Sequence, residues 1–117
     1  MLEKVERMVW LLDFYGPLLT ERQRRIMQLH YENDWSLGEI AGEMQVTRQA
    51  VHDILRRAEK SLEQYEDRLG LVEKFRLDRR RIAEAYGLLK ELRTGYHEGK
   101  ANRVLQLLEE VLATQGA

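Results

Sequence analysis

The chain has 117 residues, a net charge of −1, 44% hydrophobic and 33% charged residues, and no cysteine. This length allows one domain, or a small domain with an extension. The near-zero net charge excludes a polycation, so any affinity for nucleic acid has to come from local clusters of Lys and Arg. The lack of cysteine excludes disulfides and thiolate metal sites.

The N-terminus predicts neither secretion nor membrane insertion. Residues 1–16 (MLEKVERMVWLLDFYG) carry acidic residues within their apolar stretch and have no small-residue cleavage site, unlike a signal peptide. No run of about 18 apolar residues occurs in the chain. We therefore expect a cytoplasmic protein.

The first third of the chain predicts two helices. Apolar residues at three-to-four spacing indicate a helix over residues 2–15, which Gly16-Pro17 ends. Thr20 starts the second helix, because Gln23 three residues later completes a capping box. Asn33-Asp34 is expected to end it.

Residues 36–62 (SLGEIAGEMQVTRQAVHDILRRAEKSL) carry the spacing of a helix-turn-helix. Ser36 with Glu39 predicts a capping box for the first helix, and Thr47 caps the second. Gln45 occupies the turn position where glycine usually adopts a left-handed conformation, and we expect it to adopt that conformation at some cost. Such a unit displays the polar side of its second helix to a nucleic-acid groove.

The second helix of this unit separates into an apolar and a polar side. At 3.6 residues per turn, the apolar side is Val51, Ile54, Leu55, Ala58 and Leu62. Arg and Gln make bidentate contacts with guanine and adenine, and other cations suit phosphates. The alternative is a solvated helix face, which is common in a chain with one-third charged residues. The predicted nucleic-acid-binding residues are Arg48, Gln49, His52, Arg56, Arg57 and Lys60, with Arg22, Arg24 and Arg25 from the preceding helix.

A second basic cluster occupies residues 74–82 (KFRLDRRRI). One interpretation is a solvated helix face with ion pairs to Glu73 or Glu84. The other is contact with structured RNA, an acidic partner protein or DNA that flanks a site. The residues of this predicted second contact are Lys74, Arg76, Arg79, Arg80 and Arg81.

Apolar residues at a seven-residue period run on past the helix-turn-helix. The pattern is suited to pairing with another helix, and Gly70 predicts a bend or break within it. Further helices are expected over about 71–94 and 101–114. We call this row of apolar residues the seam. It is either packed within the chain or shared between two chains in a homodimer, and we expect the homodimer. Its residues are Val51, Leu55, Ala58, Leu62, Tyr65, Leu69 and Val72.

Together these patterns predict an all-α protein. Residues 1–65 form a helix-turn-helix domain, and residues 66–117 form a C-terminal helical extension for dimerisation and packing. The three histidines, His30, His52 and His97, have no ligand-like spacing, and no phosphate-binding or nucleophile motif occurs. The sequence therefore predicts no catalytic residue, no metal, no cofactor and no enzymatic activity.

Two resemblances support this interpretation. Residues 19–62 resemble the sigma-factor domain that reads the promoter −35 element, through the LTERQR opening, the Glu39-Ile40-Ala41 core and the helix over 47–62. The whole chain resembles the YlxM family of small bacterial proteins. The motifs that carry this second resemblance are RMVWLLDFYGPLLTERQ, LHYENDWSLGEIA, TRQAVHDILRRAE and YGLLKEL.

The YlxM resemblance implies an all-helical protein of the bacterial signal recognition particle pathway, encoded beside the particle's GTPase. We expect a regulatory protein that binds nucleic acid, either DNA or the particle's RNA. One alternative is an adaptor that docks on the GTPase through the apolar side of the last helix, led by Leu108 and Leu112. Another is a transcriptional regulator with a palindromic DNA site.

Overall fold

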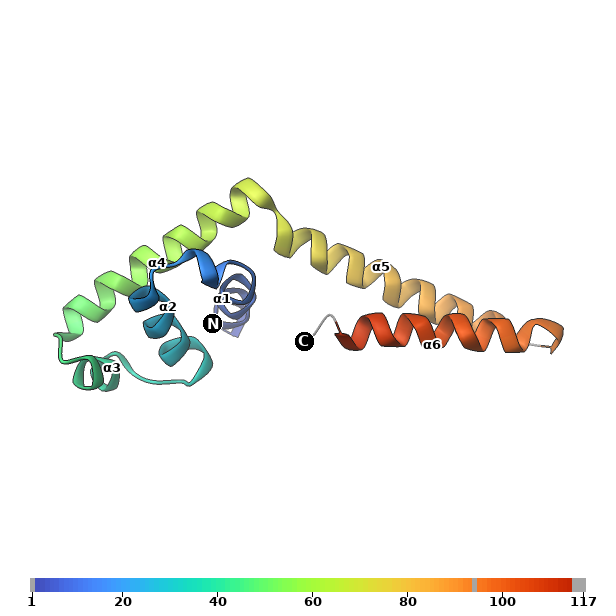
Figure 1. The fold of residues 1–117 in the computed structure, drawn as a ribbon, viewed down its shortest axis with the longest axis horizontal. Coiled ribbons are helices and arrows are strands. Elements are labelled where there is room, and N and C mark those ends of the chain that lie inside the picture. The colour runs from blue at the N-terminus through green and yellow to red at the C-terminus, as the bar shows by residue number, and fades with distance from the viewer. Residues whose placement is uncertain (1, 94, 115–117) are drawn as a thin grey trace. The chain divides into compact units, whose positions relative to one another are not determined.

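The computed structural model describes residues 2–93 and 95–114, and every regular element in these ranges is helical (Figure 1). The all-α prediction is confirmed. A short 3-10 turn, Gly16–Leu18, follows the first helix, and a π-helical turn, Gln28–Glu32, follows the second. The α-helices are α1 (Leu2–Tyr15), α2 (Glu21–Met27), α3 (Leu37–Met44), α4 (Arg48–Leu69), α5 (Leu71–Leu92) and α6 (Glu98–Thr114).

The chain divides into two compact units, Met1–Val72 and Glu73–Ala117. The boundary that we predicted after residue 65 lies inside α4. The helix and its apolar pattern continue through this position without a change. Within the described ranges, no helix combines the length and apolar character that crossing a membrane requires.

Side-chain caps start three helices at the predicted positions. In α2, the Thr20 hydroxyl accepts from the Gln23 amide at 3.1 Å, and the Gln23 side chain accepts from the Thr20 amide at 3.2 Å. Ser36 and Glu39 form the same reciprocal pair at α3, at 3.1 and 3.0 Å. The Thr47 hydroxyl accepts from the Ala50 amide at 3.0 Å at the start of α4. These caps satisfy amides that have no partner within the helix.

The Glu39 cap makes the stability of α3 dependent on pH. Hydrogen bonds from Ser36 hold the pKa of Glu39 below its ordinary value. The stabilisation is therefore present above the ordinary glutamate pKa of about 4.3 and is lost as the pH falls through the lower, folded-state pKa. We expect Glu39→Gln to reduce the loss of stability between pH 7 and pH 3, measured by urea unfolding. Gln23 already fills the equivalent position in α2, so glutamine keeps the cap without the titration. An unchanged acid dependence would contradict this role.

The helical turns that begin with α2 end at Asn33, as predicted, but the last of them is π-helical. The α-helical bonding of α2 ends at Met27 and widens into the π-helical turn, where the Asn33 amide donates to the Gln28 carbonyl at 3.1 Å. Asp34 then adopts a left-handed conformation with φ of 60°, which Asp tolerates better than most residues. The Trp35 amide donates back to the Leu29 carbonyl at 2.9 Å, and this bond directs the chain into α3.

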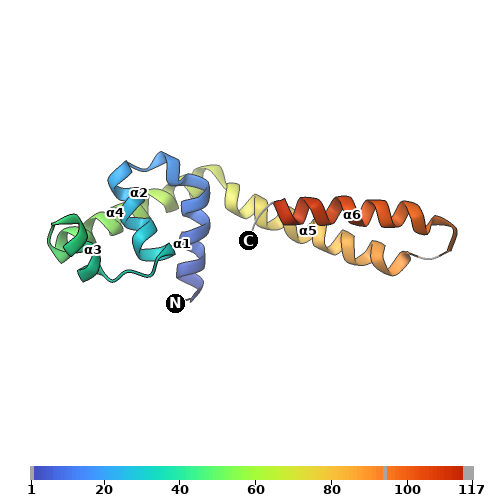
Figure 2. The ribbon, with the colours of Figure 1, turned by 60° about the horizontal axis from the view of Figure 1, so that its bottom comes forward.

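The core of the first unit lies between α4 and the three helices before it (Figures 1 and 2). The seam that was predicted to pair with a second chain is part of this core. Tyr65 packs against it, and Leu69 is 56% exposed at the end of α4. The predicted role of the seam in dimerisation is therefore wrong, because the same apolar period serves intramolecular packing. The seam residues in the core are Val51, Leu55, Ala58, Leu62 and Val72.

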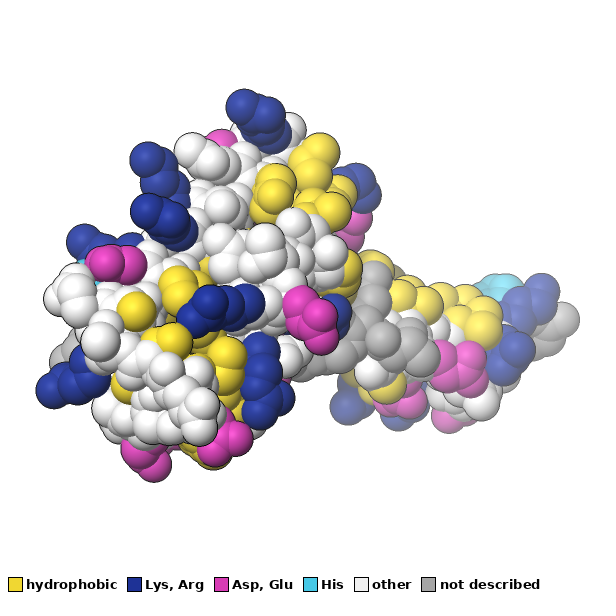
Figure 3. Space-filling model, turned by 60° about the vertical axis from the view of Figure 1, so that its left-hand side comes forward, with side chains coloured by type: hydrophobic (Ala, Val, Ile, Leu, Met, Phe, Trp, Pro, Cys, Tyr) yellow, Lys and Arg dark blue, Asp and Glu magenta, His cyan; other side chains and the backbone are white. Residues whose placement is uncertain are grey.

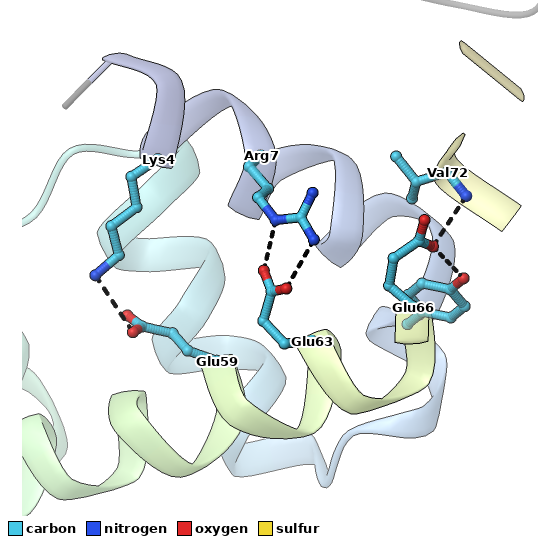
Figure 4. Close-up of polar contacts among 7 residues, drawn as sticks. Lys4, Arg7, Glu59, Glu63, Glu66 and Val72 are labelled. Atoms are coloured by element: carbon cyan, nitrogen blue, oxygen red, sulfur yellow. Dashed lines mark hydrogen bonds and ion pairs between the residues drawn. The ribbon is translucent and has the colours of Figure 1, made fainter. Parts of the chain in front are cut away.

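Polar contacts join α1 to α4 along one side of this core (Figure 4). Arg7 forms a bidentate pair with Glu63, at 2.6 and 2.7 Å. Lys4 lies 3.5 Å from Glu59. Each cation is about half exposed, so solvent screens the pairs and we expect each to contribute at most about 1 kcal/mol.

A buried contact closes the end of α4. Gly70 ends the helix in a left-handed conformation with φ of 61°, so the predicted break is confirmed. Glu66 is 9% exposed, and its carboxylate accepts from the Tyr15 hydroxyl at 2.6 Å and from the Val72 amide at 3.0 Å. The Tyr15 oxygen in turn accepts from the Leu71 amide at 3.1 Å. Two side chains thus satisfy the first amides of α5. Burial, followed by the bond to Glu66, raises the pKa of Tyr15.

The second unit is an antiparallel hairpin of α5 and α6, which lie side by side in Figures 1 and 2. Arg79 donates to the Leu112 carbonyl at 2.8 Å, and Arg93 donates to the Asn102 side chain at 3.2 Å. Between them, the Tyr86 hydroxyl donates to Glu109. The helices differ slightly from their predicted ranges. The first ends at Leu92 rather than at about residue 94, and the second begins at Glu98 rather than at about residue 101.

Candidate nucleic-acid interface

The turn between α3 and α4 has the predicted left-handed residue. Gln45 has φ of 58° and ψ of 46°, and its amide donates to the Ala41 carbonyl. The Val46 amide donates to the same carbonyl at 3.1 Å. This turn lets Thr47 begin α4 in a new direction, with Ile40 and Ala41 of α3 buried in the common core.

Replacing Gln45 with glycine is expected to stabilise the first unit. A side chain in the left-handed region costs about 1–2 kcal/mol, whereas a new glycine costs about 0.4–1 kcal/mol through the unfolded chain. We expect a net gain of about 0.5–1 kcal/mol in the free energy of unfolding, measured with urea. Gln45→Val is the matched opposite, and it should destabilise because a β-branched residue is strained at positive φ. If valine were as stable as glycine, backbone strain at this turn would not be significant.

The core holds one side of α4 and leaves the other exposed. Val51 and Ala58 are fully buried, Leu55 is 4% exposed, and Ile54 is half-buried against the core. This is the predicted apolar side. The predicted contact residues of α4, which we call the α4 face, are all exposed: Arg48, Gln49, His52, Arg56, Arg57 and Lys60.

Asp53 lies within the α4 face and interacts with two of its members. Gln49 donates to the Asp53 carboxylate at 2.9 Å, and His52 lies 3.6 Å from it. Among the described residues, Arg48, Arg56 and Arg57 form no ion pair or side-chain hydrogen bond. These three guanidinium groups are therefore available to an anionic ligand, whereas Gln49 would have to exchange its bond to Asp53 for one to a base.

Two adjoining hollows extend the α4 face towards α1 and the start of α3. One is lined by Leu37, Arg48, Gln49 and His52. The second shares Leu37 and His52 with the first, so the two adjoin beside α4, and we refer to them together as the groove. The residues lining the second hollow are Lys4, His30, Tyr31, Leu37, His52, Leu55, Arg56 and Glu59.

Five residues line the groove although the sequence did not predict them there: Lys4, His30, Tyr31, Leu37 and Glu59. The Tyr31 hydroxyl donates to Glu59, the acidic residue that also pairs with Lys4. Burial, followed by the bond to Glu59, raises the pKa of Tyr31 well above its ordinary value. His30 Nδ1 bonds to the Trp35 carbonyl at 2.9 Å. A carbonyl only accepts, so Nδ1 is the donor in this bond.

The three arginines of α2 are exposed but lie outside this groove. Arg24 and Arg25 line a separate hollow with Glu21 and Gln28, which shares no residue with the groove beside α4. Figure 3 shows Lys and Arg side chains around the end of the first unit that carries α3, with acidic and apolar side chains between them. The positive field is therefore distributed over several small patches. Binding by Arg22, Arg24 and Arg25 remains a prediction.

The second basic cluster lies on α5 and is partly engaged within its own unit. Lys74 and Arg81 pair with Asp78 at 2.8 and 3.8 Å, and Lys74 holds the pKa of Asp78 below its ordinary value. Arg79 is half-buried at the C-terminal end of α6, where the helix dipole stabilises a positive charge. Asp78 lies about one helical turn from both Lys74 and Arg81, so its carboxylate is within reach of both. Pairing with Glu73 or Glu84 stays a prediction. Arg76 and Arg80 are exposed.

No three His, Asp or Glu side chains of the described residues come together as a metal site would require. The candidate site therefore consists of the α4 face and the groove beside it.

Two capped helices joined by a tight left-handed turn, inside an all-α core, define this chain as a helix-turn-helix protein. The chain belongs to the UPF0122 family, whose description is "Putative helix-turn-helix protein, YlxM / p13 like" and whose model matches residues 2–110. A UPF0122 protein of Desulforamulus reducens is 48% identical over 100 residues, which cover 86% of this chain and 82% of the relative. Relatives from Bacillus mycoides and Bacillus thuringiensis are 53% and 52% identical over 91 residues, covering 78% of this chain and 83% of each relative.

Proposed function

We propose that this protein is a non-enzymatic regulator that binds nucleic acid through the α4 face. The main support is the display of Arg48, Arg56 and Arg57 on a helix whose opposite side is buried. A helix held in this way can enter a groove without rearrangement of the core. Gln49 and Arg48 lie in its first turn, where base edges are read, and Arg56 and Arg57 lie about two turns later, where phosphates suit them.

We further propose that the protein acts in the cytoplasm, within the signal recognition particle pathway. The support is the YlxM resemblance, and the family description extends only to a helix-turn-helix protein. The nucleic acid is then the particle's RNA or a DNA site. A transcriptional regulator that binds a promoter in the manner of the sigma-factor domain is the variant of this proposal in which DNA is the partner.

The adaptor alternative predicted docking through the apolar side of α6, led by Leu108 and Leu112, but these two side chains are not fully exposed. Leu108 and Leu112 are half-buried, and Leu105 between the helices of the hairpin is 5% exposed. An adaptor that bound the GTPase would have to use other apolar residues of the second unit. We therefore favour nucleic acid as the partner of the α4 face.

Fluorescence anisotropy tests the proposal. The full chain would be titrated against labelled signal recognition particle RNA and against random duplex DNA, at about 50 and 200 mM salt. We expect binding that weakens as salt increases, because phosphate contacts release counterions. No change in anisotropy with either probe at 50 mM salt and about 100 µM protein, the upper range of non-specific binding, would contradict it.

A pull-down from lysate, with and without nuclease, identifies the class of partner. Loss of the captured material on nuclease treatment supports nucleic acid. Capture of the particle's GTPase that resists nuclease, without binding of either probe, would favour the adaptor instead.

A further inference from the structure

The second unit buries very little of its apolar surface. Among its described side chains, Leu105 is the one hydrophobic residue that is buried, at 5% exposure. An amphipathic helix is stabilised mainly by packing its apolar side, and two helices alone can cover only one side of each other. The hairpin is therefore left with apolar surface that its own helices do not cover.

That surface consists of one stripe on each helix. On α5, Leu88 and Leu92 are 54% and 75% exposed and lie four residues apart. On α6, Val104, Leu107 and Val111 are 42%, 43% and 39% exposed, at spacings of three and four residues. Residues at these spacings share one side of a helix. Each helix thus carries an apolar stripe that is separate from its contact with the other helix.

The two stripes lie on the same side of the hairpin. On α5, the half-buried Ile82 marks the side that packs on α6, and at 100° per residue Leu88 lies about a third of a turn, and Leu92 about a quarter of a turn, behind it. On α6, the buried Leu105 marks the side that packs on α5, and Val104 and Val111 lie about a quarter to a third of a turn behind it, in the same rotational sense. Because the helices are antiparallel, equal rotations in the same sense point to one common side. Figure 3 shows hydrophobic side chains gathered along one side of this hairpin.

We propose that a second copy of this chain covers this apolar face, so that two hairpins form a four-helix bundle. Two hairpins related by a two-fold axis bring identical stripes together, which is the usual geometry of a homodimer and of a bundle core. The proposed face is Leu88, Leu92, Val104, Leu107 and Val111.

Size and charge both suit a second copy. The 17 residues of α6 span about 25 Å, and two adjacent helices are about 20 Å wide, so the side of the hairpin measures about 500 Å² before side-chain relief is counted. This is of the order of the roughly 800 Å² that each partner buries in a stable interface. The net charge of −1 means that two copies do not repel each other at long range.

Self-association would place two α4 faces in one complex, and this consequence alone rests on the proposed function. Two linked reading helices bind a repeated or palindromic target more tightly than one. The association itself needs no nucleic acid, so it can be tested without any.

Sedimentation equilibrium of the full chain at 1–100 µM tests the inference. We expect a mass twice that of the 13.9 kDa chain. The double substitution Leu88→Glu with Leu107→Glu should weaken the dimer by at least about 100-fold, because it buries four carboxylates in the bundle. Circular dichroism checks that the helices are retained. If the glutamates unfold the hairpin, Leu88→Ala with Leu107→Ala keeps helix propensity and should weaken the dimer at least about tenfold.

Two matched controls locate the interface. Ala83→Glu places the same charge on an exposed position of α5 away from the stripe, and Leu18→Glu places it on an exposed leucine of the first unit. Both should leave the dimer intact. A single-chain mass at 100 µM, or a dimer that is weakened by Leu18→Glu and not by the hairpin substitutions, would overturn the inference. So would a single-chain mass together with stoichiometric capture of another protein through these leucines, because the occupant would then not be a second copy.

Discussion

Replacing Tyr15 with alanine is expected to lower the free energy of unfolding of the first unit by about 3–5 kcal/mol, the usual cost of removing a large buried aromatic side chain. Tyr15 is 1% exposed and lies in the core between α1 and α4. Its loss leaves a cavity, removes a hydrogen bond to buried Glu66 and leaves the Leu71 amide without its acceptor. Trp10 and Trp35 both lie in the first unit, so tryptophan fluorescence during urea unfolding reports on this unit specifically.

Tyr15→Phe separates packing from hydrogen bonding. Phenylalanine keeps the ring and removes only the hydroxyl, so we expect a loss of about 1–3 kcal/mol, the cost of leaving buried polar groups unsatisfied. Amide hydrogen exchange at Leu71 should accelerate in this variant, because its acceptor is gone. Tyr86→Phe is the matched control, since it removes a tyrosine–glutamate bond at the exposed surface of the second unit. A Tyr15→Phe protein as stable as the wild type would show that the hydrogen bonds of the Tyr15 hydroxyl contribute little to the stability of the first unit.

The combined substitution of Arg48, Arg56 and Arg57 with alanine is expected to remove most of the affinity for nucleic acid. If all three contact phosphates of duplex DNA, the slope of log K against log salt should become shallower by about 2.7, at about 0.9 for each contact. Alanine keeps the helix, so a change in circular dichroism is not expected. The measurement is the anisotropy titration at several salt concentrations.

A charge-matched control makes this result specific to the α4 face. Lys90→Ala, Lys100→Ala and Arg103→Ala remove three exposed cations from the second unit and change the net charge equally. This variant should keep the wild-type slope. Equal weakening by both triple variants would mean that binding follows overall charge, and the α4 face would then have no special role.

Several features of this protein could be predicted from the sequence because their physics is local. The two capping boxes and the Thr47 cap each join groups three residues apart, so the interacting atoms are specified by spacing alone. The left-handed conformation of Gln45 and the break at Gly70 follow from the turn and the apolar pattern around them. The exposed face of α4 follows from helical periodicity, since its apolar residues must be buried on one side.

The tertiary structure decided what periodicity leaves open. A stripe such as Val51–Leu62 shows that a helix packs, and it does not show against which partner; here the partner is the rest of the first unit. The bond between Tyr15 and Glu66 joins residues 51 apart, and the groove brings Lys4 and Tyr31 beside α4. Arg79, a predicted contact residue, bonds to a carbonyl of α6, 33 residues away. Such contacts depend on how helices pack in three dimensions, because the distance between side chains on different helices is not encoded in their local spacing.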